Sequence, residues 1–403
     1  MSSSLLYHAF ALRGYHYIGT RYIGNDVIFR IEQVRQKWRC SQCGSADVIG
    51  RGQEERQFRT VPCGTKGTVL ALGVQRVECK SCGAVRQLEL GFVDERRTFT
   101  KAFERYALEL SHKTTILDTA RHLKVGWDTI KDIQKRFLQR RYAKPRLRDI
   151  QYLGIDEICV GHGHRYLTVV LDMRKGAVVF VGDGKGADAL DPFWKRLRTS
   201  KAQVEAVAID MSAAYIDAVS RNLPNAKIVF DRFHITKLFN DKLSQLRRQL
   251  QNEASAEDRA TLKGTRWLLL KNPENLDDDR DERQRLKRAL RLNKPLAIAY
   301  YLKEDLRELW SQRSKHQAAR YFDGWLARAR ASDIALLKKL ADTLEAHREG
   351  ILAWYDHAIS NGPLEGTNNK IKTMQRQAYG FRDMQFFKLR IMAIHEARFV
   401  LVG

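Results

Sequence analysis

The chain has 403 residues, a length that suits two or three domains, and 44% of them are hydrophobic, as in an ordinary globular protein. Its charge is less ordinary, because 71 Lys and Arg residues face only 47 Asp and Glu residues, for a formal net charge of +24. A surface this basic favours a polyanionic partner, with nucleic acid as the default. No apolar run approaches the roughly 20 residues of a membrane-spanning helix, so we expect no membrane partner.

The first residues also lack the charged start and the long apolar core of a signal peptide. We therefore expect a cytoplasmic protein whose thiols stay reduced.

Two C-x-x-C-G motifs, one starting at Cys40 and one at Cys79, mark the first hundred residues. Each motif brings two thiolates to one face of a tight turn, and two such turns supply the four ligands of a structural Zn²⁺. Two disulfides or four buried thiols are the alternatives, and we prefer zinc because the motif is doubled and nothing in the sequence suggests export. The 35 residues from Gly44 to Glu78 must hold strands of their own, one of them at 69–74. The predicted zinc ligands are Cys40, Cys43, Cys79 and Cys82, whereas Cys63 and Cys159 match no pair and are expected to be buried or incidental thiols.

Helical periodicity follows in three segments, at 101–111, 115–123 and 127–138. A short turn containing Gly126 joins the last two, a pattern typical of a helix-turn-helix in which the second helix reads DNA. A plain three-helix bundle is the alternative. The start of that second helix is expected to face the groove and its arginines to contact phosphates, which gives as candidate DNA contacts Trp127, Thr129, Lys131, Arg136, Arg140 and Arg141.

A third region begins near residue 150 with β-type runs. Three strands, a helix, a strand, a helix and a strand follow in that order, which is the order of the ribonuclease-H-like fold. From about residue 235 to residue 357 the sequence is helical throughout. The expected strands are 152–156, 165–172, 177–182, 205–210 and 226–231, and the expected helices between them are 187–198 and 213–221.

Carboxylates close several of these strands. Asp156 and Asp210 end two strands that are expected to be neighbours, and carboxylates at neighbouring strand ends can share Mg²⁺. Two such ions activate the attacking oxygen and stabilise the leaving oxygen of a phosphodiester. Turn or helix-cap residues are the alternative interpretation. Asp172 also ends a strand, but that strand is antiparallel and its end points away from the end that bears Asp156, so we set Asp172 aside.

The best third carboxylate is Glu365, in a helix that opens after Pro363. Asn369 lies one turn further on the same face, and we expect it to support the catalytic site. Lys370, Lys372 and Arg376 follow on this helix and would lie near DNA phosphates. An acidic residue in the first turn of any helix is the alternative.

Together these residues resemble the bacterial insertion-sequence transposases of the ISL-three group. The resemblance covers nearly the whole chain in order, and its most specific motif is the segment from Asn361 to Lys372. It implies a DDE transposase whose acidic triad is Asp156, Asp210 and Glu365, with Mg²⁺ or Mn²⁺ as catalytic metal. Asp231 and His234 match a D-x-x-H motif that supports the site, and Asp231 is the alternative second triad member.

The resemblance also implies a multidomain α/β architecture. Its parts are a zinc-ribbon-like DNA-binding domain (1–97), a helix-turn-helix domain (98–145), a ribonuclease-H-like catalytic domain (146–235 and 351–403) and an all-α insertion (236–350). Trp267, inside the insertion, is expected to be a core residue rather than a DNA contact.

The function so implied is binding of terminal inverted repeats, followed by metal-dependent cleavage and strand transfer. The partners are double-stranded DNA at the element ends and the target. Because two ends must be brought together, we expect a homodimer, associated with the bacterial nucleoid. A DNA-binding regulator without catalysis and another ribonuclease-H-like nuclease, such as a resolvase, are the alternatives.

Overall fold

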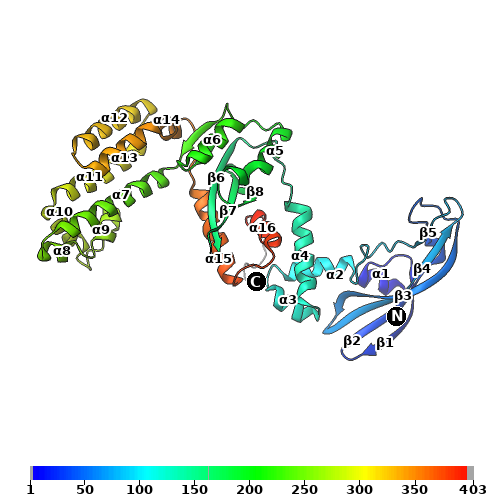
Figure 1. The fold of residues 1–403 in the computed structure, drawn as a ribbon. Coiled ribbons are helices and arrows are strands. Elements are labelled where there is room, and N and C mark those ends of the chain that lie inside the picture. Colours follow the sequence, from blue (N-terminus) through cyan, green and yellow to red (C-terminus); the bar gives the residue numbers. More distant parts are fainter. Residues whose placement is uncertain (1–2, 162, 397–403) are drawn as a thin grey trace. The chain divides into compact units, whose positions relative to one another are not determined.

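The computed structural model describes residues 3–161 and 163–396 and divides into two compact units (Figure 1). The first unit comprises the chain up to Ala143 together with Thr373–Leu389. The second comprises Lys144–Lys372 and Arg390–Glu396. None of the described helices is long and apolar enough to cross a membrane.

A five-stranded sheet forms most of the first unit. Its main path runs β1-β2-β4-β3, and β5 pairs with the far end of β4. The strands β3 and β4 form one long hairpin that fills the interval between the two cysteine motifs, as predicted. Packing of Phe58, Leu70 and Leu72 on α1 and β2 builds a core at one end of this hairpin only. The elements are α1 (Ser3–Phe10), β1 (Tyr15–Ile23), β2 (Asp26–Gln33), η1 (Arg35–Lys37), β3 (Val48–Cys63), β4 (Lys66–Cys79) and β5 (Val85–Gln87).

Three helices follow, α2 (Lys101–Leu110), α3 (Ile116–Leu123) and α4 (Trp127–Tyr142), and they confirm the three predicted helical segments. Thr100 and Thr115 cap α2 and α3 by accepting hydrogen bonds from backbone N–H groups of the first turn. The turn into α4 places Lys124 in the left-handed region at φ 53°. The sequence pattern thus located both the helices and the short turn, 124–126, that joins the last two.

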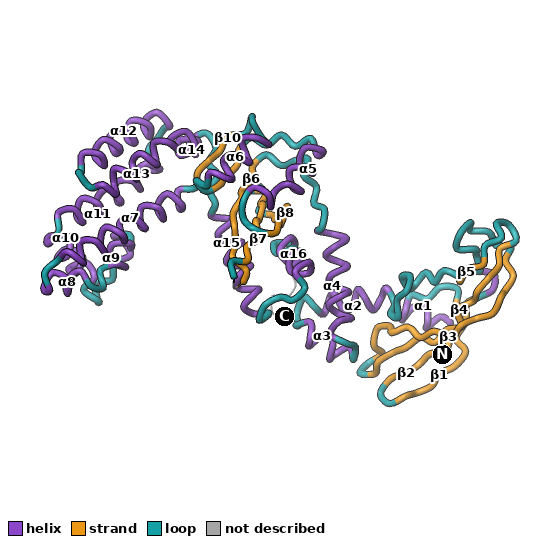
Figure 2. Tube along the Cα trace, viewed as in Figure 1, coloured by secondary structure: helices purple, strands orange, loops and turns teal. Residues whose placement is uncertain are grey.

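The sheet of the second unit has the order β10-β9-β6-β7-β8. Strand β7 runs antiparallel to both of its neighbours, whereas β9 and β10 run parallel to β6. Figure 2 shows the strands in orange and the helices in purple. All five strands occur where the sequence predicted them. They are β6 (Tyr152–Gly161), β7 (Arg165–Asp172), β8 (Ala177–Asp183), β9 (Ala206–Ile209) and β10 (Lys227–Phe230).

One prediction about this sheet was wrong: Asp156 does not end its strand. Strand β6 continues to Gly161, because residues 157–161 pair with the start of β7 in a hairpin. Asp156 therefore lies inside β6, level with the carboxyl ends of the shorter strands β9 and β10.

Helices cover both faces of this sheet. Leu153 and Ile155 share a core with η2 (Ala187–Leu190), α5 (Asp191–Ser200) and α6 (Ala213–Asn222). On the opposite face Gly154 meets α15 (Gly362–Gln377), since a Cβ at Gly154 would lie 2.7 Å from Leu364 Cδ1 and 2.5 Å from Met173 Sδ. Only glycine lets the helix approach β6 this closely.

Between β10 and α15 the chain is helical, as predicted. The core of this helical segment is continuous with the core of the sheet, through residues such as Phe230, Phe239 and Trp325. The segment contains α7 (Arg232–Glu253), α8 (Ala256–Leu262), α9 (Arg266–Leu270), η3 (Pro273–Asn275), α10 (Glu282–Leu292), α11 (Lys294–Arg307), η4 (Glu308–Ser311), α12 (Lys315–Ala331), α13 (Ala335–Ala346), α14 (Arg348–Leu352) and η5 (Ala353–Tyr355), and α16 (Met384–Met392) follows α15.

Trp267 contradicts its prediction, because 64% of its side chain is exposed. Its helix, α9, has only five residues, and Leu268 and Leu269 take the positions that face the core.

We expect Gly154→Val to destabilise the second unit by about 1–3 kcal/mol, because the added side chain must displace Leu364 or Met173. Gly366→Ala is the control on α15, the helix that Gly154 meets, because an added Cβ at Gly366 has nothing within 4 Å. Urea unfolding of both variants measures the difference. Equal stability of the two variants would contradict the close approach of α15.

Candidate functional site

Three aspartates lie at one level of the second sheet. Strand β6 pairs with β9 so that Gly154 faces Ala208, and two further steps of this register bring Asp156 level with Asp210. Strand β10 pairs with β9 so that Phe230 faces Ile209, and one further step brings Asp231 level with Asp210. Residues level on neighbouring parallel strands point to the same face, about 5 Å apart. The sheet therefore aligns the three carboxylates in a row.

Asp156 is held by two hydrogen bonds. Its Oδ1 accepts from the Glu157 backbone N–H at 2.8 Å, and its Oδ2 accepts from the Asn368 side-chain amide at 2.8 Å. Burial raises the pKa of Asp156 above its ordinary value, and the neighbouring charge of Asp210 adds to this. The two hydrogen bonds and the charge of His234 oppose the rise without cancelling it. A cation bound beside Asp156 would therefore stabilise the ionised form of its carboxylate.

The remaining members of the row are positioned by local backbone. Asp210 accepts a hydrogen bond from the Ser212 backbone N–H at 2.9 Å, in the turn between β9 and α6. Asp231 is 4% exposed and immediately precedes α7, but its carboxylate does not cap that helix. His234 lies in the first turn of α7, near enough to Asp156 to influence its charge.

Glu365 lies in the first turn of α15, and its side chain is exposed. The same helix faces β6 with Leu364 against Gly154 and Asn368 against Asp156, one turn apart. Glu365 therefore belongs to the part of α15 that packs against β6, while its own side chain stays exposed.

Sequence reasoning chose Asn369 as the supporting amide, but Asn369 is exposed and Asn368 bonds Asp156. The sequence could have indicated Asn368 instead, because Leu364, Asn368 and Ile371 occupy the i, i+4 and i+7 positions of one buried helix face. Asn368 belongs to that face and Asn369 does not.

Among the described residues, two buried amide side chains, Asn368 on α15 and Asn361 directly before it, have atoms without a hydrogen-bond partner. Asn361 is 3% exposed, and neither its Oδ1 nor its Nδ2 has a hydrogen-bond partner. The Oδ1 of Asn368 is in the same condition. Buried polar atoms are normally satisfied, so a bound group or ordered water is the expected partner at such places. Carboxylate and amide oxygens are the ligands and water contacts that a hard cation prefers.

The four predicted zinc ligands do come together. The sulfurs of Cys40 and Cys82 are 3.7 Å apart, those of Cys43 and Cys79 are 3.5 Å apart, and all four lie within 4.8 Å of one another. A tetrahedral Zn–S₄ site with bonds near 2.3 Å requires about 3.8 Å between sulfurs. Among the residues that the structure describes, this is the only group of three or more potential metal ligands gathered so tightly.

Two matching turns hold these sulfurs. In each, the glycine after the second cysteine bonds back to the first cysteine carbonyl at 2.9 Å and has a positive φ, 76° at Gly44 and 70° at Gly83. Backbone N–H groups of Cys43 and Gln42 lower the pKa of Cys40. Burial raises the pKa of Cys79, but the N–H groups of Cys82 and Ser81 outweigh it and bring it to about 6. The turns thus favour the thiolate at Cys40 and Cys79, whereas at Cys43 the Ser45 N–H lowers the pKa but hydrogen bonds with the Cys82 and Cys79 thiols outweigh it and raise the pKa.

Cys63 and Cys159 lie outside this cluster, and both are exposed. They are incidental rather than buried thiols.

The candidate DNA contacts of α4 fall into two groups. Trp127 is 43% exposed at the start of the helix, with the Lys131 ammonium 5.4 Å from its ring centre, and Thr129 is half-buried beside it. Lys131 also lies 3.5 Å from Asp128. This end of the helix retains an exposed polar and aromatic surface.

The arginines of α4 are placed differently from the prediction. Arg136 and Arg140 both pair with Glu104, a buried carboxylate on α2, at 3.5 and 2.7 Å. Burial lowers the pKa of Arg136, and its guanidinium lies over Phe99. These two side chains join α2 to α4, and only Arg141 is exposed without a carboxylate at ion-pair distance among the described residues.

On α15 the predicted cations Lys370, Lys372 and Arg376 are all exposed. The Lys370 ammonium lies 3.3 Å from His395 Nδ1, and this charge, after burial, lowers the pKa of His395.

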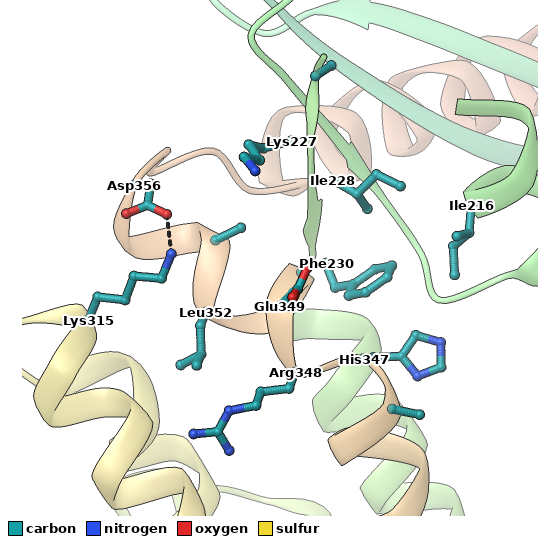
Figure 3. A pocket seen from close by; sticks show the side chains of 14 residues that line it. Ile216, Lys227, Ile228, Phe230, Lys315, His347, Arg348, Glu349, Leu352 and Asp356 are labelled. Atoms are coloured by element: carbon teal, nitrogen blue, oxygen red, sulfur yellow. Dashed lines mark hydrogen bonds and ion pairs between the residues drawn. The ribbon is translucent and has the colours of Figure 1, made fainter. Parts of the chain in front are cut away.

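A cavity of about 780 Å³ lies elsewhere, where the edge strand β10 meets α14 (Figure 3). Two of its cations are already neutralised, Lys315 by Asp356 and Arg348 by Asp323. None of the aspartates of the row lines it. The cavity therefore marks the junction of the sheet with the helical segment, away from the aspartate row.

Three family models match the chain. The zinc-finger of transposase IS204/IS1001/IS1096/IS1165 matches residues 36–82, and the helix-turn-helix domain of transposase family ISL3 matches residues 88–138. The DDE model of the same family, described as transposase, matches residues 153–391, which is more than half of the chain. The chain belongs to the ISL3 family of transposases. Its cysteine cluster lies in the zinc-finger match, which supports a structural zinc site, and the helix-turn-helix match contains α2, α3 and most of α4.

Relatives of known name support this membership. The transposase for insertion sequence element IS1001 of Bordetella parapertussis is 33% identical over 358 residues, covering 88% of each chain. The transposase for insertion sequence element IS1557 of Mycobacterium tuberculosis is 30% identical over 375 residues, covering 86% of this chain and 83% of the relative. The Drosophila P element transposase strand transfer complex aligns over 75% of this chain with 13% identity and a TM-score of 0.39, too low to carry an argument.

We expect Cys79→Ser to abolish stoichiometric zinc binding and to unfold the two cysteine turns, because metal binding stabilises them. The hydrophobic core around Phe58 and Leu70 lies at the other end of the hairpin and should stay protected. Metal analysis and amide hydrogen exchange measure both effects. Cys63→Ser, an exposed thiol outside the cluster, is the control and should keep its zinc.

We expect Asn368→Ala to slow DNA cleavage about tenfold or more, because Asp156 loses a charge-assisted hydrogen bond. That bond lowers the pKa of Asp156, so its loss raises the pKa and moves the acid limb of the pH–rate profile to higher pH. The exposed Asn369→Ala is the matched control. An unchanged acid limb in Asn368→Ala, or an equal shift in both variants, would remove Asn368 from the site.

Proposed function

We propose that this transposase binds the terminal inverted repeats of its insertion sequence, cleaves DNA at those ends and joins the freed 3′-hydroxyl to target DNA. One observation carries the assignment of the site. The parallel register sets Asp156 and Asp210 level on neighbouring strands, and the contacts of Leu364 and Asn368 bring the helix of Glu365 against the same strand face. These three carboxylates are the proposed catalytic triad, with Asp231 and His234 as support.

The strand order β8-β7-β6-β9-β10, with β7 antiparallel, supports a ribonuclease-H-like catalytic domain. We assign residues 146–235 and 351–403 to this domain and residues 236–350 to a helical insertion. Residues 1–97 form the zinc-ribbon-like domain and 98–145 the helix-turn-helix domain. Thr373–Leu389 group with the first unit. For example, the Asp383 carboxylate forms an ion pair with Lys135 on α4, with Oδ2 and Nζ 2.8 Å apart. This stretch therefore differs from the rest of its proposed domain in what it packs against.

The donor set fits a hard divalent cation, since the charge of Asp210 and the amide of Asn368, whose Oδ1 has no partner among the described residues, lie near Asp156. Mg²⁺ or Mn²⁺ held by Asp156, Asp210 and Glu365 would activate the attacking oxygen and stabilise the leaving oxygen. Asn368 fixes the orientation of Asp156, and the strand register fixes its spacing from Asp210.

Two in-line displacements complete the reaction. Water attacks the phosphodiester at the element end and releases a 3′-hydroxyl, whose oxygen then attacks a phosphodiester of the target. Each step exchanges one P–O bond for another, so no covalent protein intermediate is required. Because two ends are joined in one event, we propose a homodimer in the paired-end complex, working on the bacterial nucleoid.

We expect Asp156→Asn to abolish cleavage, by about a thousandfold or more, while end binding persists. Burial raises the pKa of Asp156, so the folded state binds this proton more tightly than the unfolded state, and stability falls as pH rises between the two pKa values. Above that window a neutral Asn removes the cost of the buried charge, so the variant should be at least as stable as the native chain at neutral pH.

The assay uses a labelled duplex that carries the element end, with Mg²⁺ or Mn²⁺. Asp172→Asn is the matched control, because Asp172 is a buried aspartate that accepts hydrogen bonds in the turn after β7. Cleavage by Asp156→Asn at the native rate would refute the triad. Binding without cleavage by the native chain would indicate a regulator, and cutting of branched DNA without element ends would indicate a resolvase-type nuclease.

A further inference from the structure

A pocket of about 460 Å³ in the helical segment gathers four cations. Lys242, Arg247 and Arg248 come from α7 and Arg266 comes from α9. Asp241 is the single acidic residue that lines it, and its side chain is exposed. The pocket lies well along α7 from the aspartate row, beyond the first turn that carries His234.

No carboxylate neutralises these cations. Within the described residues, none of the four forms an ion pair, whereas elsewhere in the helical segment Arg307 pairs with Glu274 and Glu304, and Arg330 with Asp342 and Glu345. Burial lowers the pKa of Arg247, and the charges of Arg266 and Arg248 lower it further. The guanidinium groups therefore repel one another, at an energetic cost that a bound anion would relieve.

Two of the arginines are also held in place. Arg247 Nη1 donates to Gln251 Oε1 at 2.6 Å and to the Leu262 carbonyl at 3.4 Å, while its buried Nε has no partner. Arg266 lies with its guanidinium 4.8 Å from the ring centre of Trp267. Donors fixed before binding lose little conformational entropy when an anion arrives.

We propose that this pocket binds the phosphodiester backbone of duplex DNA, as a contact separate from the zinc site and the helix-turn-helix. The proposal rests on the proposed function in taking DNA as the ligand. Guanidinium groups match phosphate oxygens with paired N–H donors, and a contact made only to the backbone reads no sequence. The helical segment would then hold DNA without regard to sequence, while the first unit selects the element end.

The test compares two double variants of the full-length chain. Lys242→Gln with Arg248→Gln removes two cations from the pocket. Arg328→Gln with Lys338→Gln removes one Arg and one Lys from the same helical segment, at exposed ion pairs with Asp305 and Asp333. Both double variants lower the net charge equally, so a difference in their DNA affinity reports a contact at the pocket itself.

The measurement is DNA affinity over a salt series, by fluorescence anisotropy, with an element-end duplex and a scrambled duplex. The pocket variant should lose about tenfold or more in affinity at physiological salt and about two units of log–log salt slope. The affinity of the pocket variant for both duplexes should fall by the same factor. The control should keep the native slope.

Equal slopes in the native chain and the pocket variant would overturn the inference, as would the same loss in the control. A loss confined to the element-end duplex would also overturn it, because a backbone contact has no sequence preference. These outcomes are distinct from failure of the proposed function, in which the native chain does not cut element ends although the pocket variant still shows the lower salt slope.

Discussion

The register between β6 and β9 is the constraint on which the candidate active site depends. It aligns Asp156 with Asp210 and, through β10, with Asp231. A slip by one residue would turn one carboxylate to the opposite face, into the core that Leu153 and Ile155 share with α5 and α6. The apolar alternation of β6 therefore specifies the geometry of the site as well as the packing of the sheet. Because Gly154 has no side chain, α15 can pack closely against β6 and bring Asn368 to Asp156.

The excess positive charge is used in two different ways. On α4, Arg136 and Arg140 are joined to the buried Glu104 and hold helices together. On α7, Arg247 and Arg248 face other cations across a pocket. Net charge alone therefore indicates the class of partner, but the distribution of carboxylates decides which cations remain available to it.

Local patterns in the sequence predicted every strand of the second sheet, the three helices before it and the four zinc ligands, because periodicity and short spacing carry those features. Tertiary pairing decided the rest. Strand β6 outruns Asp156 because residues 157–161 find partners in β7, and Arg136 turns inward because Glu104 is buried on another helix. Trp267 was wrongly predicted to be buried. The short helix α9 packs Leu268 and Leu269 into the core, and the hydrophobicity of Trp267 alone does not indicate this. The triad itself stays a proposal, although Asn368 was recoverable from its helical face.

Helix α7 carries residues of both the proposed catalytic site and the cationic pocket. It begins at Arg232, directly after Asp231, and continues unbroken for 22 residues to Glu253. An α-helix of that length is a stiff rod of roughly 33 Å. Its first turn carries His234 and its later turns carry Lys242, Arg247 and Arg248. A displacement of the distant end, as when an anion draws those cations together, would tilt the start of the helix, where Asp231 and His234 lie at the proposed catalytic site.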